Sequence, residues 1–209
     1  DICGEGNTEA FMEQAIEYFG FITGLLYLYW EIRQNNLMWV VGILSAMAYI
    51  AVFAQSGLYA AMSFQVYYLV VSIYGLYVWH RDKKRGKVSE NENDEACNNL
   101  VYRVLDWKMV LASTFASLAI FFLLYIVLEK FTGDPMPAAD AVITALSIVA
   151  TYWLGRLYIH QWILWIVVDL LSVFLFFSQA LYPTALLYVL YTVCAVYGFV
   201  HWKKKGIKL

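Results

Sequence analysis

The chain has 209 residues, of which 62% are hydrophobic, 18% aromatic and only 14% charged. Soluble globular proteins are about half apolar and a quarter charged, so this composition indicates a membrane protein and excludes a soluble nucleic-acid-binding domain. The net charge of -2 says little by itself, because the positions of Lys and Arg relative to the spans decide how a membrane protein is oriented.

Seven apolar runs follow one another along the chain, and each is about long enough to cross the hydrocarbon core of a bilayer. They cover residues 16–30, 38–53, 58–79, 109–128, 138–157, 162–177 and 181–200. The sequence therefore predicts an all-α polytopic membrane protein with seven transmembrane helices.

The runs divide the chain into four predicted segments. A first three-helix repeat covers 10–80, a cytoplasmic linker 81–106, a linker transmembrane helix 107–130 and a second three-helix repeat 133–203. The linker contains the strongly polar stretch RDKKRGKVSENENDEACNN, basic first and acidic later, which we expect to be flexible.

Basic residues fall almost entirely on one side of the predicted membrane. With seven spans, Lys130 lies alone on one face, while the remaining Lys and Arg residues lie on the other. The positive-inside rule then puts the N-terminus outside and the C-terminus in the cytoplasm.

An internal repeat relates the two three-helix segments. The stretch from Trp39 to Trp79 aligns without a gap with the stretch from Trp162 to Trp202. The alignment also pairs Tyr29 with Tyr152, Arg33 with Arg156, and Gly75 with Gly198. Two copies of three helices joined directly would point in opposite directions, and the linker helix restores the same direction. This predicts a 3+1+3 arrangement with parallel repeats and a ligand site between them.

An acid and two aromatic rings mark the predicted site. Trp162, Trp165 and Asp169 are spaced by three and four residues, so they share one face of the sixth span. An unpartnered carboxylate at that depth costs about 2.5 to 3.5 kcal/mol on insertion scales. The repeat partner of Asp169 is Ala46, so the fold itself does not require the acid. The alternative is that Asp169 pairs with a neighbouring hydroxyl or is protonated, and holds helices together.

Neutral polar side chains complete the predicted site. Gln65 lies in the third span, and its repeat partner Tyr188 lies in the seventh. Thr144 and Ser147 line the fifth span, where helix packing through small residues is an equally good interpretation. Together these residues suit an aromatic, cationic, polyhydroxylated small molecule, because ring faces attract cations. We expect no cofactor and no metal.

Four stretches resemble the PnuC family of bacterial vitamin transporters. They are QWILWIVVD at 161–169, ALYPTALLYVLY at 180–191, SGLYAAMSFQVYYLVVSIYGLYVW at 56–79 and DAVITALSIVATYWLGR at 140–156. The W-x-x-W pair followed by an acid is the most specific of them.

The resemblance implies a function, an assembly and a set of site residues. It implies nicotinamide riboside uptake across the bacterial inner membrane by facilitated diffusion, with trapping by a cytoplasmic kinase. It also implies a homotrimer with a fold related to the SWEET sugar transporters. By the same resemblance Trp162, Trp165 and Asp169 belong to the substrate site, Gln65 faces it from the other repeat, and Thr144 and Ser147 are weaker candidates.

Three alternatives differ in substrate or in mechanism. The substrate could be thiamine or riboflavin, and Asp169 could couple transport to an ion in a symporter. An intramembrane enzyme is disfavoured, because His80, His160 and His201 all fall near the cytoplasmic edge and no catalytic pair or metal cluster shares one depth.

Overall fold

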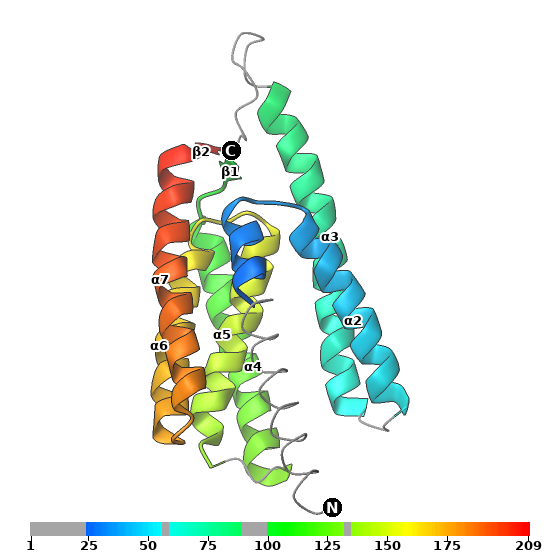
Figure 1. Cartoon of the computed structure of the whole chain (residues 1–209), viewed down its shortest axis with the longest axis vertical. Helices are drawn as coiled ribbons and strands as arrows, with labels where there is room; N and C mark the ends of the chain where they lie inside the picture. Colours follow the sequence, from blue (N-terminus) through cyan, green and yellow to red (C-terminus); the bar gives the residue numbers. More distant parts are fainter. Residues whose placement is uncertain (1–23, 56–58, 89–99, 132–134) are drawn as a thin grey trace, which may run out of the picture.

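A computed structural model describes residues 24–55, 59–88, 100–131 and 135–209. The described part of the chain is mostly helical (Figure 1). Residues 24–32 are helical and precede α2 (Leu37–Gln55), α3 (Tyr59–Val88), α4 (Trp107–Phe131), α5 (Pro137–Gly155), α6 (Gln161–Ser178) and α7 (Tyr182–Lys205). Two strands of three residues each, β1 (Leu100–Tyr102) and β2 (Gly206–Lys208), complete the described elements.

The apolar runs predict the helices well. Among the described residues, four helices, α4 to α7, are long and apolar enough to cross a membrane, which confirms the expected all-helical, multi-span class. The run at 16–30 falls partly outside the described residues. The third run continues as helix beyond its predicted end at Trp79, because α3 extends through the basic residues to Val88. The two short strands are absent from the prediction.

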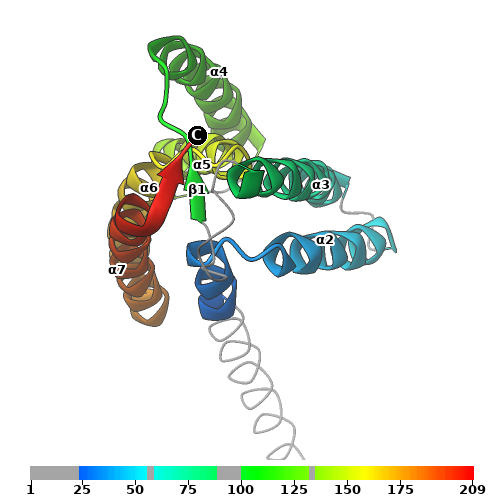
Figure 2. The same cartoon turned by 90° about the horizontal axis from the view of Figure 1, so that it is seen from above.

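The helices pack as neighbours in a simple order. α2 packs against α3, α3 contacts α5, and α5 contacts both α4 and α6, while α6 packs along α7. Seen from above, the helical residues 24–32 lie between α7 and α2 (Figure 2). A hydrogen bond from the Trp202 indole Nε1 to the carbonyl of Ile32, at 2.9 Å, ties α7 to the end of this first helical segment.

Short reversals join the helices. Gln34, Leu157 and Ala180 adopt positive φ angles of 49°, 62° and 60°, and each follows the end of a helix, where a left-handed residue commonly stops it. Proline stands in the first turn of α5 and of α7, where its missing N–H costs no helical hydrogen bond. The chain can therefore reverse direction within a few residues.

A short parallel sheet lies at one end of the molecule, here called the β1 end. β1 pairs with β2 in the register Leu100 with Gly206 and Tyr102 with Lys208. The side-chain amide of Gln34 donates to the carbonyl of Val101 at 2.7 Å and accepts from its N–H at 3.1 Å. These bonds attach the end of the first helical segment to β1 and, through β2, to the end of α7.

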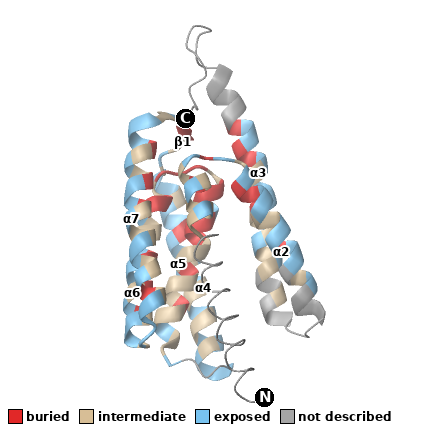
Figure 3. Ribbon diagram, viewed as in Figure 1, coloured by how far each residue is buried: buried red, intermediate tan, exposed pale blue. Residues whose placement is uncertain are grey.

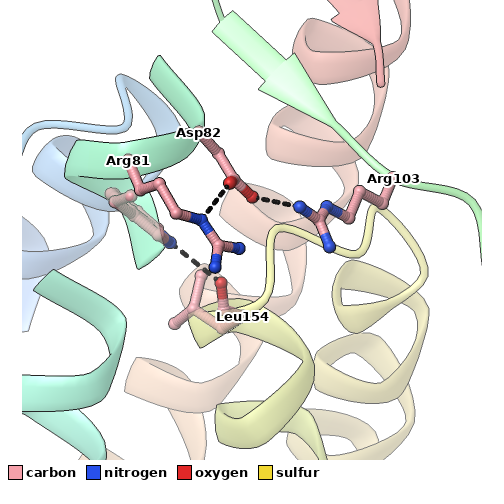
Figure 4. A network of polar contacts seen from close by, with 5 residues as sticks. Arg81, Asp82, Arg103 and Leu154 are labelled. Carbon is pink, nitrogen blue, oxygen red and sulfur yellow. Dashed lines mark hydrogen bonds and ion pairs between the residues drawn. The ribbon is translucent and has the colours of Figure 1, made fainter. Parts of the chain in front are cut away.

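A buried acid fixes α3 to the same region. The Asp82 carboxylate is fully buried and receives the guanidinium groups of Arg81, at 3.0 Å, and of Arg103, which follows β1 (Figure 4). The Trp79 indole Nε1, one turn earlier, donates to the carbonyl of Leu154 at 3.1 Å. α3 is thereby bonded to both the segment after β1 and the end of α5.

Four tryptophans form the centre of the core. Trp39, Trp79, Trp162 and Trp202 are at most 1% exposed. The rings of Trp39 and Trp79 meet edge to face at 5.3 Å, and those of Trp162 and Trp202 meet in the same way at 5.5 Å. Trp79 and Trp202 are 6.5 Å apart. Such pairs add roughly 0.5 to 1.5 kcal/mol each beyond the burial of their area, so these contacts hold α2, α3, α6 and α7 together.

Two glycines allow the tryptophans to pack this closely. A Cβ on Gly198 would lie 2.7 Å from Cζ2 and Cη2 of Trp162, and one on Gly75 would lie 2.5 Å from Cζ2 of Trp39. A Cβ on Gly155 would meet nothing closer than 3.7 Å. The aligned glycines of the two repeats thus serve the same packing purpose.

We expect Gly198→Ala to destabilise the protein by about 1 to 3 kcal/mol, since the added methyl group must displace a fully buried indole. Gly155→Ala is the matched control, because its methyl group makes only ordinary contacts, and it should be nearly neutral or slightly stabilising. Thermal unfolding of the purified variants in detergent measures both. Equal melting temperatures for the two variants would contradict the packing argument.

α4 lies at the margin of the helix group. Within α4, all of which is described, Ser113 alone is buried, and its hydroxyl accepts a hydrogen bond from the Trp153 indole at 2.9 Å. Many of the buried residues elsewhere gather toward the β1 end (Figure 3). The exposed apolar surface of α4 is what a helix in contact with lipid presents.

Candidate functional site

One face of α6 carries the polar and aromatic side chains of the predicted site. Gln161, Trp165 and Asp169 follow one another at intervals of four residues, which places them one above another along the helix. Gln161 is fully buried and Asp169 is 4% exposed, while Trp165 is half-buried. The apolar flanks of α6 are exposed at Ile163 and Leu170. The polar face therefore points into the protein.

The two tryptophans of the motif have different environments. Trp162 is fully buried in the tryptophan core against Trp202 and Gly198. Its main role is therefore to pack α6 against α7. Trp165 lies at the edge of that core and keeps part of its surface exposed. The indole N–H groups of both are buried without a hydrogen-bond partner among the described residues. Trp165 is thus the better placed of the two for a ligand.

Asp169 lies beside the tyrosines of α7. Its carboxyl group interacts electrostatically with Tyr188 and Tyr191 and with the thiol of Cys194. Tyr188 stacks on Phe176 at 5.2 Å and meets the ring of Tyr191 edge to face at 5.6 Å. Within the described residues no basic side chain forms an ion pair with Asp169. The structure thus brings together two predicted site residues, Asp169 and Tyr188.

The other predicted residues lie farther from this group or use their polar atoms locally. The Ser147 hydroxyl donates to the carbonyl of Ile143 at 2.8 Å, within its own helix. This favours the packing interpretation for the α5 stripe, to which Thr144, half-buried, also belongs. Gln65 is half-buried on α3, one turn before Tyr68, which interacts electrostatically with Tyr188. The structure therefore connects α3 with the α7 tyrosines through Tyr68, and it shows no contact between Gln65 and α7 among the described residues.

A second buried acid, Glu31, is absent from the predicted site. It is 2% exposed at the end of the first helical segment and interacts with Tyr27, Asp169 and the amide of Gln161. Sequence alone held a signal, because its repeat partner is Leu154, as the partner of Asp169 is Ala46. Glu31, Gln161, Asp169, Tyr188 and Tyr191 are hereafter called the interior polar cluster.

The loop before α6 contributes a neutral histidine. Burial lowers the pKa of His160 from its usual value of 6.5, so the imidazole is uncharged near neutral pH. Its Nδ1 accepts a long hydrogen bond, 3.5 Å, from the backbone N–H of Leu105. His160 therefore supports the loop and adds no positive charge beside the interior polar cluster.

A separate recess of about 390 Å³ lies at the β1 end. It is lined by Arg103, Val104, Tyr158 and Leu209. None of these is a predicted site residue or a member of the interior polar cluster. The recess lies where the segment after β1 meets the loop between α5 and α6, at the bridge between Arg103 and Tyr158. It is therefore separate from the polar face of α6.

Comparison with known proteins gives the family. The model of a family described as "Nicotinamide mononucleotide transporter" matches residues 14–204. A curated relative, the nicotinamide riboside transporter PnuC of Escherichia coli K12, is 28% identical over 206 residues, which cover 90% of this chain and 84% of the relative. The chain belongs to the PnuC family of transporters.

Two further PnuC proteins are similar to this chain over most of its length. The nicotinamide riboside transporter PnuC of Neisseria mucosa is 27% identical over 190 residues, covering 88% of this chain and 70% of the relative. A solved structure, "Crystal structure of the Vitamin B3 transporter PnuC", superposes with a TM-score of 0.61 at 24% identity, covering 88% of this chain and 78% of that one. The resemblance to the PnuC family is thus confirmed, and a PnuC protein is a transporter rather than an enzyme.

Proposed function

We propose that this PnuC protein carries nicotinamide riboside into the cell by facilitated diffusion. The relatives from Escherichia coli and Neisseria mucosa are named as nicotinamide riboside transporters. The substrate combines a cationic aromatic ring with a hydroxylated sugar. Trp165 offers a flat surface for such a ring, and Asp169 and Tyr188 offer acceptors and donors for the charge and the hydroxyl groups.

The observation that supports this most directly is the isolation of Asp169. The carboxyl group is buried, lies one turn beyond Trp165, and has no basic partner among the described residues. A buried charge is costly unless it is paired. A cationic ligand supplies the missing pair, which gives the acid a purpose that helix packing does not.

The acid also favours the nucleoside over the nucleotide. The family description names the mononucleotide, whereas the relatives are named for the riboside. The two molecules differ by a phosphate group, which is negatively charged near neutral pH. A phosphate beside Asp169 would meet a like charge, and no basic side chain among the described residues is paired with Asp169 to compensate for it. We therefore infer that the riboside is the ligand.

We infer a 3+1+3 arrangement in which two three-helix bundles enclose the ligand site. Equivalent contacts recur at aligned positions: Trp39 on Trp79 and Trp162 on Trp202. The guanidinium of Arg33 lies 4.7 Å from the Tyr29 ring centre, and that of Arg156 lies 5.8 Å from the Tyr152 ring centre. The positive φ angles of Gln34 and Leu157 also fall at aligned positions. Such correspondence supports two copies of one unit.

Transport in this proposal follows alternating access. The two bundles rock about the bound ligand and open it to each side in turn. A cytoplasmic kinase phosphorylates the imported riboside, and the negative charge of the phosphate prevents the nucleotide from returning through the same site. The β1 end, which carries Arg33, Arg81, Arg103, Arg156 and the basic last turn of α7, would face the cytoplasm of a bacterial inner membrane.

We also infer that three copies assemble. The exposed apolar side of α4, with Phe115, Phe122 and Phe131, leaves a long surface available to lipid or to a neighbouring copy. The mass of the purified protein in detergent, from light scattering corrected for bound detergent, tests this. A mass equal to one chain would remove the trimer from the proposal while leaving the transport function untouched.

Uptake into vesicles tests the transport function. Protein reconstituted into lipid vesicles should equilibrate labelled nicotinamide riboside without any ion gradient and stop at equal concentrations. Vesicles that enclose a nicotinamide riboside kinase and ATP should accumulate the label as the nucleotide. Vesicles without protein are the control for leakage. A requirement for a proton or sodium gradient would instead identify a symporter, and stronger competition by thiamine or riboflavin would identify another vitamin.

A further inference from the structure

Glu31 lies deep in the protein near the β1 end. Its side chain is 2% exposed and interacts with the amide of Gln161 and with Asp169, both on α6. It also interacts with Tyr27, one turn earlier on the same helical segment. Glu31 therefore connects the first half of the chain to the polar face of α6, across the boundary between the two inferred bundles.

Several buried polar atoms around Glu31 have incomplete hydrogen bonding. The Gln161 amide is a polar neighbour of Glu31, but the contact does not reach hydrogen-bond geometry. Glu31 Oε1, both polar atoms of that amide and the Trp165 indole N–H therefore make no full hydrogen bond among the described residues. Buried polar groups in native proteins are nearly always paired, so a cluster of unpaired ones requires an explanation. A ligand that bonds to them in the loaded protein is such an explanation.

Each of the two acids aligns with an apolar residue in the other repeat. Asp169 aligns with Ala46, and Glu31 aligns with Leu154, which is 1% exposed and packs in the core. A position that tolerates a buried leucine in one copy does not need a carboxyl group for packing in the other. Each half of the chain thus contributes to the interior polar cluster one acid that its counterpart does not have.

The spacing on α6 sets the geometry between the acids. Gln161 and Asp169 lie two turns apart, about 12 Å along the helix axis, with Trp165 midway between them. Glu31 interacts with the side chain of Gln161. An aromatic ring of the ligand placed against Trp165 would therefore have Glu31 about one helical turn toward the start of α6 and Asp169 about one turn toward its end. We propose that Glu31 is a second acidic residue of the substrate site, and that with Asp169 it selects a positively charged aromatic ring.

This inference rests on the proposed transport of nicotinamide riboside, and it makes a prediction about charge. The riboside has an uncharged counterpart, its 1,4-dihydropyridine form, of nearly the same shape. Glu31→Gln keeps the size of the side chain and its hydrogen-bonding ability but cannot carry the negative charge that a bound cation would stabilise on Glu31. Binding of the cationic form should weaken by about tenfold, while binding of the dihydro form should change by less than about twofold.

The test is calorimetric titration of the 209-residue protein in detergent with the two ligands. Glu129→Gln, on the exposed last part of α4, is the matched control and should bind both ligands as the unchanged protein does. Each variant's melting temperature and elution volume report on folding. Should Glu31→Gln fold poorly, Glu31→Asp preserves the charge and should retain the preference for the cationic ligand.

The outcomes separate this inference from the proposed function. If the unchanged protein binds the cationic riboside and Glu31→Gln binds it equally well, Glu31 is outside the site and the inference is wrong. An equal loss for both ligands would show that Glu31 acts through hydrogen bonds and would overturn its role in charge selection. If the unchanged protein binds neither ligand, the proposed function itself fails.

Discussion

An Asp169→Asn variant is expected to bind nicotinamide riboside at least about tenfold more weakly than the unchanged protein. Asparagine has nearly the same shape, so the interior polar cluster should keep its packing while it loses a charge. Two unit charges roughly 6 Å apart interact by roughly 3 kcal/mol at an effective dielectric constant of about 20. A tenfold change in affinity requires only about 1.4 kcal/mol. The expected loss therefore remains about tenfold even if solvent screening halves the interaction between the two charges.

The measurement is a binding titration, accompanied by thermal unfolding of the same sample. Trp165, one turn before Asp169 on α6, supplies a second variant. Trp165→Ala removes the flat surface that attracts a cation by about 0.5 to 2 kcal/mol. Trp165→Phe keeps an aromatic ring. Trp107, 65% exposed on α4, gives the control Trp107→Ala. Unchanged affinity in both Asp169→Asn and Trp165→Ala, with the fold intact, would place the ligand elsewhere.

The second large effect concerns stability. Trp202→Ala should lower the free energy of unfolding by about 3 to 5 kcal/mol, as truncations of buried aromatic residues do. The indole contacts Trp162 and Trp79 edge to face and donates a hydrogen bond to the Ile32 carbonyl. Three parts of the chain therefore lose contacts at once.

Thermal unfolding in detergent measures this change, and Trp107→Ala is again the control, with little expected effect because its side chain is mostly exposed. Trp202→Phe separates the contributions, since it keeps an aromatic ring in the core and removes the hydrogen bond. A melting temperature for Trp202→Ala equal to that of the control would contradict the central role assigned to the tryptophan core.

The helices could be predicted from the sequence because apolar length is a strong local signal. The ends of the spans were harder to place. α3 continues through a basic stretch whose polarity resembles a loop, and β1 depends on a pairing with β2 and on bonds from Gln34. Those interactions join positions far apart in the sequence, and three-residue strands carry no periodic pattern of their own.

The candidate site could be predicted only where a polar residue interrupts an apolar run. Asp169 stands out in that way, and the structure places it beside Tyr188. Glu31 and Gln161 do not, since both fall at the ends of predicted spans, where polar residues ordinarily meet water. Their burial arises from the approach of the first helical segment to α6, which only the tertiary structure reveals.

The two indole hydrogen bonds near the β1 end have a consequence for biosynthesis. Trp79 bonds to the carbonyl of Leu154, and Trp202 bonds to the carbonyl of Ile32, so each half supplies the donor for a helix terminus of the other. A ribosome synthesises the residues around Ile32 long before Trp202. The first described helical segment must therefore wait for α7 before the carbonyl of Ile32 gains this bond, and a nascent chain stalled before α7 would expose that carbonyl and the surface that α7 covers.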